Sequence, residues 1–246
     1  MATGLLLLGV GSGTKLMQFL SGLDKTYEAT IRLGASTSTD DAEGELGEIH
    51  DASKISSHEL AREVLKLTGS IEQVPSSVSA IKVAGKRAYD LVRSGEEVVL
   101  MSRSVTVSKF EIVGEPSVVG QYLDVNVEVD CSSGTYVRAL ARDVGDALGV
   151  GGHLTALRRT RIGAFEVSNA SDIAQEPTLV TNLEVLKTLM PEIAISPQQE
   201  TDLRHGKRLA LQIAEMSCAT ASGRLVAVIE PVGSEAKSSV VFPEEI

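Results

Sequence analysis

Tyr136 and Arg138 are the most chemically suggestive pair in this sequence, because they follow a tight Ser-Ser-Gly-Thr turn at the end of an alternating stretch. A tyrosine offers a flat ring and a hydroxyl, and an arginine can hold a carboxylate or a phosphate through two parallel hydrogen bonds. A cation in the first turn of a helix opposes the helix dipole. This placement favours a functional role for Arg138, although an exposed surface arginine is the simpler interpretation.

Two predicted elements hold this pair on a rigid support. Residues 121–131 alternate apolar and polar side chains, which predicts a strand with Cys131 on its buried face. A helix is predicted from about 135 to 148, with Arg138 and Arg142 one turn apart on the same face. The sequence therefore predicts a strand, a turn and a helix that together display functional side chains.

The first fifty residues predict strands and one polar loop. Residues 5–10 read as a buried strand, and residues 24–34 as a strand that carries Tyr27. A tyrosine on a strand is more often a half-buried core residue than a ligand-binding one, so Tyr27 keeps both interpretations. The glycines of residues 9–15 fit neither the Walker nor the dinucleotide pattern and indicate a strand-to-helix turn. Residues 40–51 are acidic, which is typical of solvated surface.

The rest of the chain predicts further helices and a β-rich end. Ser56 and Glu59 form a capping box at the start of a helix. A short strand and a helix that ends at Gly95 follow, and another helix is predicted over 179–190. Residues 191–199 contain two prolines and are typical of a linker or a domain boundary, after which the last fifty residues predict a small β-rich appendage.

Composition limits the class of protein. The 246 residues are 43% hydrophobic, so the chain can build a large core, and its two cysteines sit in different segments with no metal-ligand spacing. This suits a reducing, cytoplasmic location. No apolar run approaches the length of a membrane span. The net charge is -10, yet residues 131–165 hold five arginines and two aspartates, which predicts a local basic face for an anionic ligand.

Several motifs, in order and in register over residues 1–165, resemble the bacterial tRNA pseudouridine-55 synthase (TruB) family. They are Met1-Ala-Thr-Gly4, Asp24-Lys-Thr-Tyr27, Thr39-Asp-Asp-Ala-Glu-Gly44, Val74-Pro75, Ser79-Ala-Ile-Lys82, Gly85-Lys-Arg-Ala-Tyr89, Gly134-Thr-Tyr-Val-Arg138 and His153-Leu-Thr-Ala-Leu157-Arg-Arg159. The tail is similar to the shortened RNA-binding domain, related to the PUA domain, of some members. Each motif alone is weak, but together they are a specific signal.

The resemblance implies an α+β pseudouridine synthase fold, with a mixed, largely antiparallel sheet, flanking helices and a small PUA-like domain. It implies a catalytic domain over residues 1–190 and an RNA-binding domain over 195–246. The implied reaction converts uridine 55 in the T-loop of tRNA to pseudouridine, with the uridine flipped out of the loop. No cofactor and no metal are expected, and the protein is expected to be a monomer whose partner is the T-arm of tRNA.

The resemblance also implies roles for individual residues. Tyr27 matches the tyrosine that stacks on the flipped base, and Tyr136 and Leu157 match positions that line its pocket. Arg138 matches the arginine that pairs with the catalytic aspartate, which agrees with the preference of a guanidinium for the charged form of a carboxylate. The residues expected to meet tRNA phosphates are Lys82, Arg158 and Arg159.

One departure from the family pattern concerns the nucleophile itself. In the family the aspartate belongs to a Gly-Thr-Leu-Asp-Pro segment that directly precedes the residues matched by Met1-Ala-Thr-Gly4. The expectation is therefore an N-terminally truncated chain, inactive as given, in which Arg138 lacks its partner. Two explanations stay open: a start site placed too far downstream in a normal enzyme, or a short product that binds tRNA without turnover.

Overall fold

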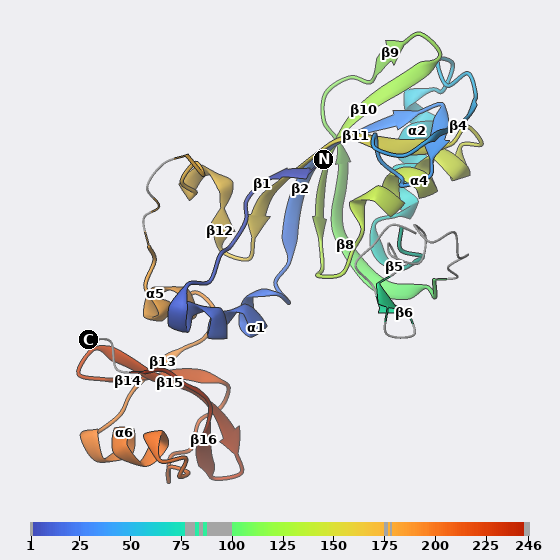
Figure 1. The fold of residues 1–246 in the computed structure, drawn as a ribbon. Helices are drawn as coiled ribbons and strands as arrows, with labels where there is room; N and C mark the ends of the chain where they lie inside the picture. Colours follow the sequence, from blue (N-terminus) through green and yellow to red (C-terminus); the bar gives the residue numbers. More distant parts are fainter. Residues whose placement is uncertain are drawn as a thin grey trace. The chain divides into compact units, whose positions relative to one another are not determined.

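The structure is a computed structural model that describes residues 2–76, 82–83, 86–87, 100–174, 177 and 179–243. The chain divides into two compact units (Figure 1). The first comprises Met1–Leu5 and Gly22–Ala170, and the second comprises Leu6–Ser21 and Ser171–Ile246. The predicted helix that ends at Gly95 lies outside the described residues.

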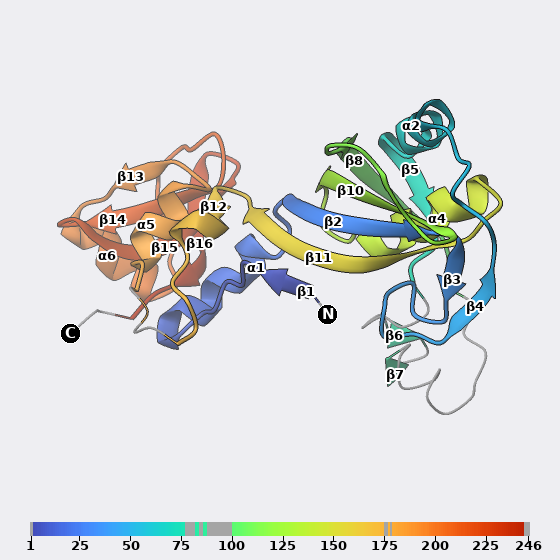
Figure 2. The ribbon, with the colours of Figure 1, turned by 90° about the horizontal axis from the view of Figure 1, so that it is seen from above.

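A mixed, largely antiparallel sheet is the centre of the first unit, as predicted (Figure 2). Its main path runs β1-β11-β2-β10-β8-β5, in which only the pair β1 and β11 is parallel. The strands of this path are β1 (Ala2–Gly4), β2 (Lys25–Leu33), β5 (Gly69–Gln73), β8 (Arg103–Ile112), β10 (Tyr122–Cys131) and β11 (Gly152–Ile162). Short strands β9 (Ser117–Val119) and β12 (Phe165–Glu166) extend β10 and β11.

Two helices cover one face of this sheet. α2 (Ser57–Lys66) begins at the predicted capping box, in which Ser56 accepts from the Glu59 amide, and α4 (Val137–Ala147) begins after the Ser-Ser-Gly-Thr turn. Their apolar faces share one core with the inward residues of the strands: Leu60, Val64, Leu140, Val144, Ile31, Leu33, Val125, Val127, Val129 and Cys131. The strict alternation of β10 is confirmed, because the apolar residues that face one side are buried.

Smaller hairpins and a short helix complete the first unit. β3 (Ala35–Thr37) pairs with β4 (Leu46–Ile49), and β6 (Lys82–Val83) pairs with β7 (Lys86–Arg87). A 3-10 helix, η2 (Val167–Asn169), follows β12. The loop between β3 and β4 carries Asp40 and Asp41 toward α4, which makes it the structural basis of the site described below.

The second unit is a separate small β structure with its own core. Its sheet order is β13-β14-β15-β16, with strands Glu192–Ala194, Ser217–Ala221, Arg224–Val232 and Glu235–Val241. Its helical segments are η1 (Gly11–Leu16), α1 (Met17–Leu20), α5 (Asn182–Lys187) and α6 (Pro197–Arg204). The predicted β-rich appendage is thus present, but the predicted linker over 191–199 is wrong, because those residues form β13 and begin α6.

The buried strand predicted over residues 5–10 is also wrong. The strand lies earlier, at Ala2–Gly4, and Gly4 ends it with a φ of +95°. Leu6, Leu8 and Val10 are 65%, 76% and 70% exposed. A run of apolar residues forms a buried strand only where a partner strand is available. Here the pairing with β11 ends at the hydrogen bond from the Leu5 amide to the Arg159 carbonyl, so the residues after Leu5 have no strand to pair with in β11. In the described part of the chain, no helix is both long and apolar enough to cross a bilayer.

Candidate functional site

Tyr27, Leu157 and Arg159 share one face of the sheet in the first unit. In the antiparallel ladder of β2 and β11, Tyr27 is opposite Arg159 and Ala29 is opposite Leu157. Directly opposed residues point to the same side, and Tyr27 and Leu157 both pack against the core. The register therefore brings together three of the residues that the sequence predicted to bind the uridine and the RNA.

Arg158 belongs to the other face. It is opposite Glu28 in the same ladder, and it is exposed. Successive side chains of a strand point to opposite faces, so Arg158 and Arg159 cannot both line the Tyr27 face. Arg159 is further fixed by a hydrogen bond of 2.8 Å from its Nε to the Leu5 carbonyl.

The environment of Tyr27 keeps its hydroxyl protonated. Burial raises the pKa of the Tyr27 hydroxyl above its ordinary value, an effect that the neighbouring Arg159 guanidinium opposes. Tyr27 is consequently a neutral phenol at physiological pH. It can donate or accept a hydrogen bond and presents an uncharged ring for stacking.

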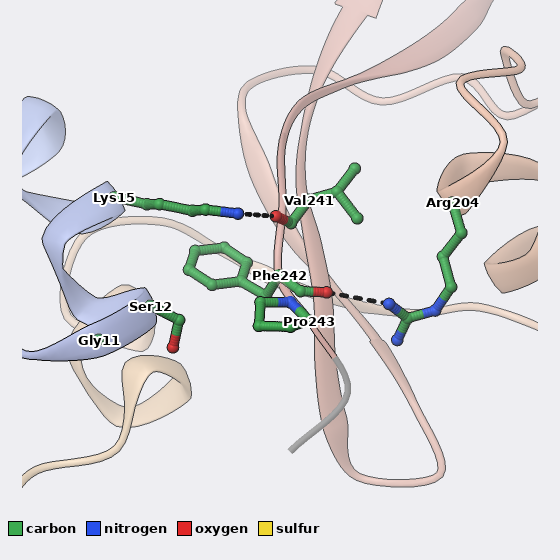
Figure 3. A pocket seen from close by; sticks show the side chains of 7 residues that line it. All are labelled: Gly11, Ser12, Lys15, Arg204, Val241, Phe242 and Pro243. Carbon is green, nitrogen blue, oxygen red and sulfur yellow. Dashed lines mark hydrogen bonds between the residues drawn. The ribbon is translucent and has the colours of Figure 1, made fainter. Parts of the chain in front are cut away.

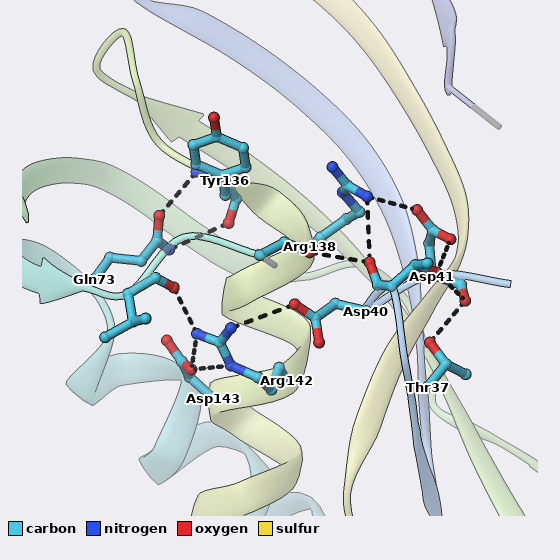
Figure 4. A network of polar contacts seen from close by, with 11 residues as sticks. Thr37, Asp40, Asp41, Gln73, Tyr136, Arg138, Arg142 and Asp143 are labelled. Atoms are coloured by element: carbon cyan, nitrogen blue, oxygen red, sulfur yellow. Dashed lines mark hydrogen bonds and ion pairs between the residues drawn. The ribbon is translucent and has the colours of Figure 1, made fainter. Parts of the chain in front are cut away.

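Gln73 holds Tyr136 at the start of α4. The Tyr136 amide donates to the Gln73 side-chain oxygen at 2.8 Å, and the Gln73 side-chain nitrogen donates to the Tyr136 carbonyl at 3.1 Å (Figure 4). Gln73 is fully buried, and Arg103 lies over the Tyr136 ring at 5.4 Å. The sequence analysis missed Gln73, although a polar residue at an inward position at the end of a strand was an available signal.

Arg138 has a carboxylate partner, Asp41, that the sequence analysis did not assign to it. The Arg138 Nη1 atom donates to Asp41 Oδ2 at 3.0 Å and to the Thr39 carbonyl at 3.2 Å. Asp41 also forms an isolated bridge with Leu154 of β11, the strand that carries Leu157. The predicted helix position of Arg138 is therefore confirmed, and its side chain reaches across to the loop after β3.

Asp41 is bound into its own turn as well as to Arg138. Its Oδ1 atom accepts from the Thr39 hydroxyl at 2.6 Å and from the Glu43 amide at 3.1 Å. Burial acts to raise the pKa of the Asp41 carboxyl, but these two donors and Arg138 outweigh it, so the pKa lies below the ordinary value. Asp41 is thus a firmly ionised carboxylate.

Asp40 is an exception to the interpretation of residues 40–51 as solvated surface, because Glu43, Glu45, Glu48 and Asp51 are exposed as expected. Its side chain is buried, with a residue exposure of 8%, and it pairs with Arg142 at 3.3 Å. The sequence shows that this stretch is acidic, but it does not show that Arg138 and Arg142, one helical turn apart on α4, face the start of the stretch. Figure 4 shows both pairs between the loop and α4.

The remaining predicted residue, Lys82, is described only in its backbone, which pairs with Arg87 in the hairpin of β6 and β7. Within the described ranges, no group of three or more His, Cys, Asp or Glu side chains could hold a metal ion. The first unit presents the Tyr27 ring, the ion pair of Arg138 with Asp41 and the Arg159 guanidinium as candidate groups for a site.

An open cavity of about 540 Å³ lies wholly within the second unit (Figure 3). Two cations at its rim are tied to the end of the last strand: Lys15 donates to the Val241 carbonyl at 2.7 Å, and Arg204 donates to the Phe242 carbonyl at 2.9 Å. Arg204 also binds Glu200 at 2.8 Å, which balances its charge. The cavity residues are Gly11, Ser12, Lys15, Arg204, Val241, Phe242 and Pro243.

Comparison with known proteins agrees with this geometry along the chain. Residues 1–137 match the N-terminal domain profile of the TruB family of pseudouridylate synthases. Residues 138–189 match the tRNA pseudouridylate synthase B C-terminal domain, and residues 190–243 match the tRNA pseudouridine synthase II C-terminal domain.

Individual relatives give the same result. The tRNA pseudouridine synthase B of Leifsonia xyli subsp. xyli is 48% identical over 100% of this chain and 85% of its own length. The corresponding protein of Nocardia farcinica is 49% identical over 96% of this chain and 79% of its own length. Among solved structures, an H/ACA RNP bound to a substrate RNA containing 2′-deoxyuridine is 18% identical with a TM-score of 0.60, over 96% of this chain and 71% of that one.

At 18% identity, that structural likeness concerns the fold alone. The family profiles confirm the predicted pseudouridine synthase architecture. The family profiles and the relatives near 48% identity show, beyond the fold, which family the chain belongs to. The chain belongs to the TruB family of pseudouridylate synthases.

Proposed function

We propose that this protein isomerises uridine 55 in the T-loop of tRNA to pseudouridine. The observation that carries the proposal is Arg138, which is partly buried at the start of α4 and holds a carboxylate at 3.0 Å in a protein that is 48% identical to a tRNA pseudouridine synthase B. A guanidinium so placed stabilises carboxylate charge where the reaction needs an ionised aspartate.

The proposed reaction exchanges one bond of the nucleoside for another. A carboxylate attacks C1′ of the ribose of the flipped uridine as the bond from C1′ to N1 breaks, which leaves an ester between carboxylate and ribose and a detached base. The base turns, its C5 attacks C1′ and displaces the carboxylate, and N1 takes up a proton. The hydrogen on C5 then leaves as a proton. Tyr27 would stack on the base, Tyr136 and Leu157 would line its pocket, and Arg159 would bind phosphate on the same face of the sheet.

Lys82 completes the proposed phosphate-binding set. Arg158, which the sequence also predicted to meet phosphate, would need RNA on the other face of the sheet, so the proposed set leaves it out. Both cysteines are free and buried, which suits a reducing, cytoplasmic setting. We propose a monomer that binds the T-arm of tRNA through the first unit.

A second candidate function is tRNA binding without turnover. Asp41, the carboxylate bound to Arg138, already accepts hydrogen bonds on both oxygens from Thr39, Glu43 and Arg138. A carboxylate held in this way is a poor nucleophile, which favours this candidate for the 246 residues taken alone.

Tritium release from tRNA that carries 5-tritiated uridine tests both candidates. We would assay the 246-residue chain beside a chain with Gly-Thr-Leu-Asp-Pro placed before Met1, and measure T-arm binding by both. Turnover by the longer chain, reduced about a hundredfold or more by Arg138→Ala, supports the isomerase. Binding by both chains without any turnover supports the second candidate, and turnover by the 246 residues alone overturns it.

A further inference from the structure

Asp40 occupies a backbone conformation that needs outside support. Its φ is +60°, in the left-handed region that disfavours residues with a Cβ, although aspartate tolerates it better than most. Its side chain is buried as well. Strained conformations at buried positions persist only where the surrounding structure holds them.

The backbone on both sides of Asp40 is held by β3, by β11 and by Ser76, which follows β5. The Asp40 amide donates to the Thr37 carbonyl at 3.2 Å, and the Asp40 carbonyl accepts from the Leu154 amide at 3.0 Å. The Ser76 hydroxyl donates to the Thr39 carbonyl at 3.1 Å, the same carbonyl that Arg138 binds. The peptide between Thr39 and Asp40 is therefore held at both its carbonyl and its amide, and the Asp40 carbonyl is held by β11.

The Asp40 side chain is held by Arg142, whose guanidinium joins three elements. It donates to Asp40 Oδ2 at 3.3 Å, to the Val74 carbonyl at 2.7 Å and to Asp143 Oδ1 at 2.8 and 3.0 Å (Figure 4). Val74 directly follows Gln73, which holds Tyr136. One arginine thus ties the Asp40 turn to α4 and to the strand end that positions Tyr136.

The two arginines of α4 form a matched set with the two aspartates of the loop. Arg138 binds Asp41 and Arg142, one turn later, binds Asp40. If Asp40 left its conformation, the Asp41 carboxylate would turn away from Arg138, because the two residues share a peptide unit. We propose that Arg142 and Asp40 are positioning residues, which hold the Asp40–Asp41 turn so that Asp41 fixes the Arg138 guanidinium in the site.

This inference rests on the proposed role of Arg138 for its functional meaning, but its first test does not need turnover. We would follow the side-chain NMR signals of Arg138 in nitrogen-labelled protein, assigned with Arg138→Lys. Rotation about the bond from Nε to Cζ is slow while Nη1 is held by a carboxylate. We expect Asp41→Asn to accelerate it, and Arg142→Ala and Asp40→Asn to accelerate it about tenfold, as loss of a charge-assisted hydrogen bond implies.

Asp124→Asn is the matched control. It breaks the pair between Arg32 and Asp124, which has two bonds of 2.8 and 2.7 Å and comparable partial exposure, in the same unit but away from the loop. We expect it to lower the melting temperature without changing the Arg138 signals. An unchanged Arg138 in folded Arg142→Ala, or an equal change in Asp124→Asn, would overturn the inference.

A second measurement separates positioning from substrate binding. In the chain that carries the preceding Leu-Asp-Pro segment, Arg142→Ala is expected to lower kcat by about tenfold to a hundredfold, as a small misplacement of a catalytic group does. The KM for tRNA should stay within about twofold, because Arg142 touches no substrate in this scheme. An equal change in KM would contradict a positioning role. If no variant turns over, the proposed function fails while the NMR result still decides the inference.

Discussion

The Arg138 Nη1 atom lies 3.0 Å from Asp41 Oδ2, so the arginine of α4 and the carboxylate of the loop after β3 form a direct ion pair in the first unit. The pair joins segments that are 97 residues apart in the chain. Its partial burial makes it more than a surface contact, because solvent screens it incompletely.

The Asp41 pKa gives a pH prediction for stability. Because folding lowers the pKa of Asp41, the ionised form stabilises the native state. The contribution is complete above the unfolded pKa of about 3.9 and is lost as the pH falls through the lower folded pKa. We expect Asp41→Asn to destabilise the protein most near pH 7 and progressively less below about pH 4. Urea unfolding across this range checks the sign, and a difference that grows on acidification would contradict it.

The two cysteines should be unreactive in the native protein. Cys131 is 1% exposed, and burial raises the pKa of its thiol to about 11; Cys218 is 0% exposed, and burial raises its thiol pKa too. The thiolate is the nucleophile, so iodoacetamide near pH 8 should label neither residue until urea unfolds the chain. Because Cys131 lies in the first unit and Cys218 in the second, mass spectrometry of each peptide reports the folding of each unit. Rapid native labelling of Cys131 would show that the core is open.

Tyr27 should act through its ring rather than through its charge. Burial raises the pKa of the Tyr27 hydroxyl, so the hydroxyl is neutral at physiological pH. We expect Tyr27→Phe to bind a T-arm RNA within about twofold of the native affinity, whereas Tyr27→Leu should lose about 1–3 kcal/mol of stacking. Fluorescence anisotropy at fixed salt measures both, with protection of Cys131 as the check on folding. Equal losses in the two variants would assign the effect to the hydroxyl instead.

Arg159 and Arg158 offer a matched pair for RNA binding, since they are neighbours on opposite faces of β11. Arg159→Ala should weaken T-arm binding and reduce the slope of log Kd against log salt by about one phosphate contact. Arg158→Ala removes the same charge from the other face and should change the slope little. Titrations at several salt concentrations compare them, and a larger effect at Arg158 would place the RNA on the opposite face of the sheet.

At position 145, within α4, glycine should give a more stable protein than alanine, the opposite of the usual order in a helix. Alanine in place of an interior helical glycine ordinarily stabilises by about 1 kcal/mol. A Cβ on Gly145 would lie 2.2 Å from the backbone of Gly151 and Gly152, so α4 would have to move away from β11, at a cost of about 1–3 kcal/mol or more. Urea unfolding of Gly145→Ala should show net destabilisation. Gly149→Ala, with open space around it but a φ of +72°, is the control for backbone strain alone.

The sequence predicted correctly those helices and strands whose signals lie entirely within a short stretch of chain. The alternation of residues 121–131 and the capping box at Ser56 were sufficient because each depends on near neighbours in the chain. The role of residues 5–10 was not predictable in this way, because strand formation depends on a partner strand, and the pairing of β1 with β11 ends at Arg159.

The sequence singled out individual residues of the candidate site but not the network that joins them. The resemblance named Arg138, Tyr27 and Leu157, whose roles stay predictions. The partner of Arg138, the support of Tyr136 by Gln73 and the burial of Asp40 arise from contacts between segments far apart in sequence. The acidic residues 40–51 do not reveal from sequence that Arg138 and Arg142, about a hundred residues later, form ion pairs with two of them.

The two ion pairs, Asp41 with Arg138 and Asp40 with Arg142, also fix the register of the loop against α4. A helical turn advances about 5.4 Å, so side chains four residues apart on α4 meet carboxylates that are consecutive in the loop. Insertion or deletion of a single residue between Gly34 and Asp40 would shift the loop by one position and offer each arginine the wrong neighbour. The length of this connection is therefore set by the pitch of a helix that lies about a hundred residues further along the chain.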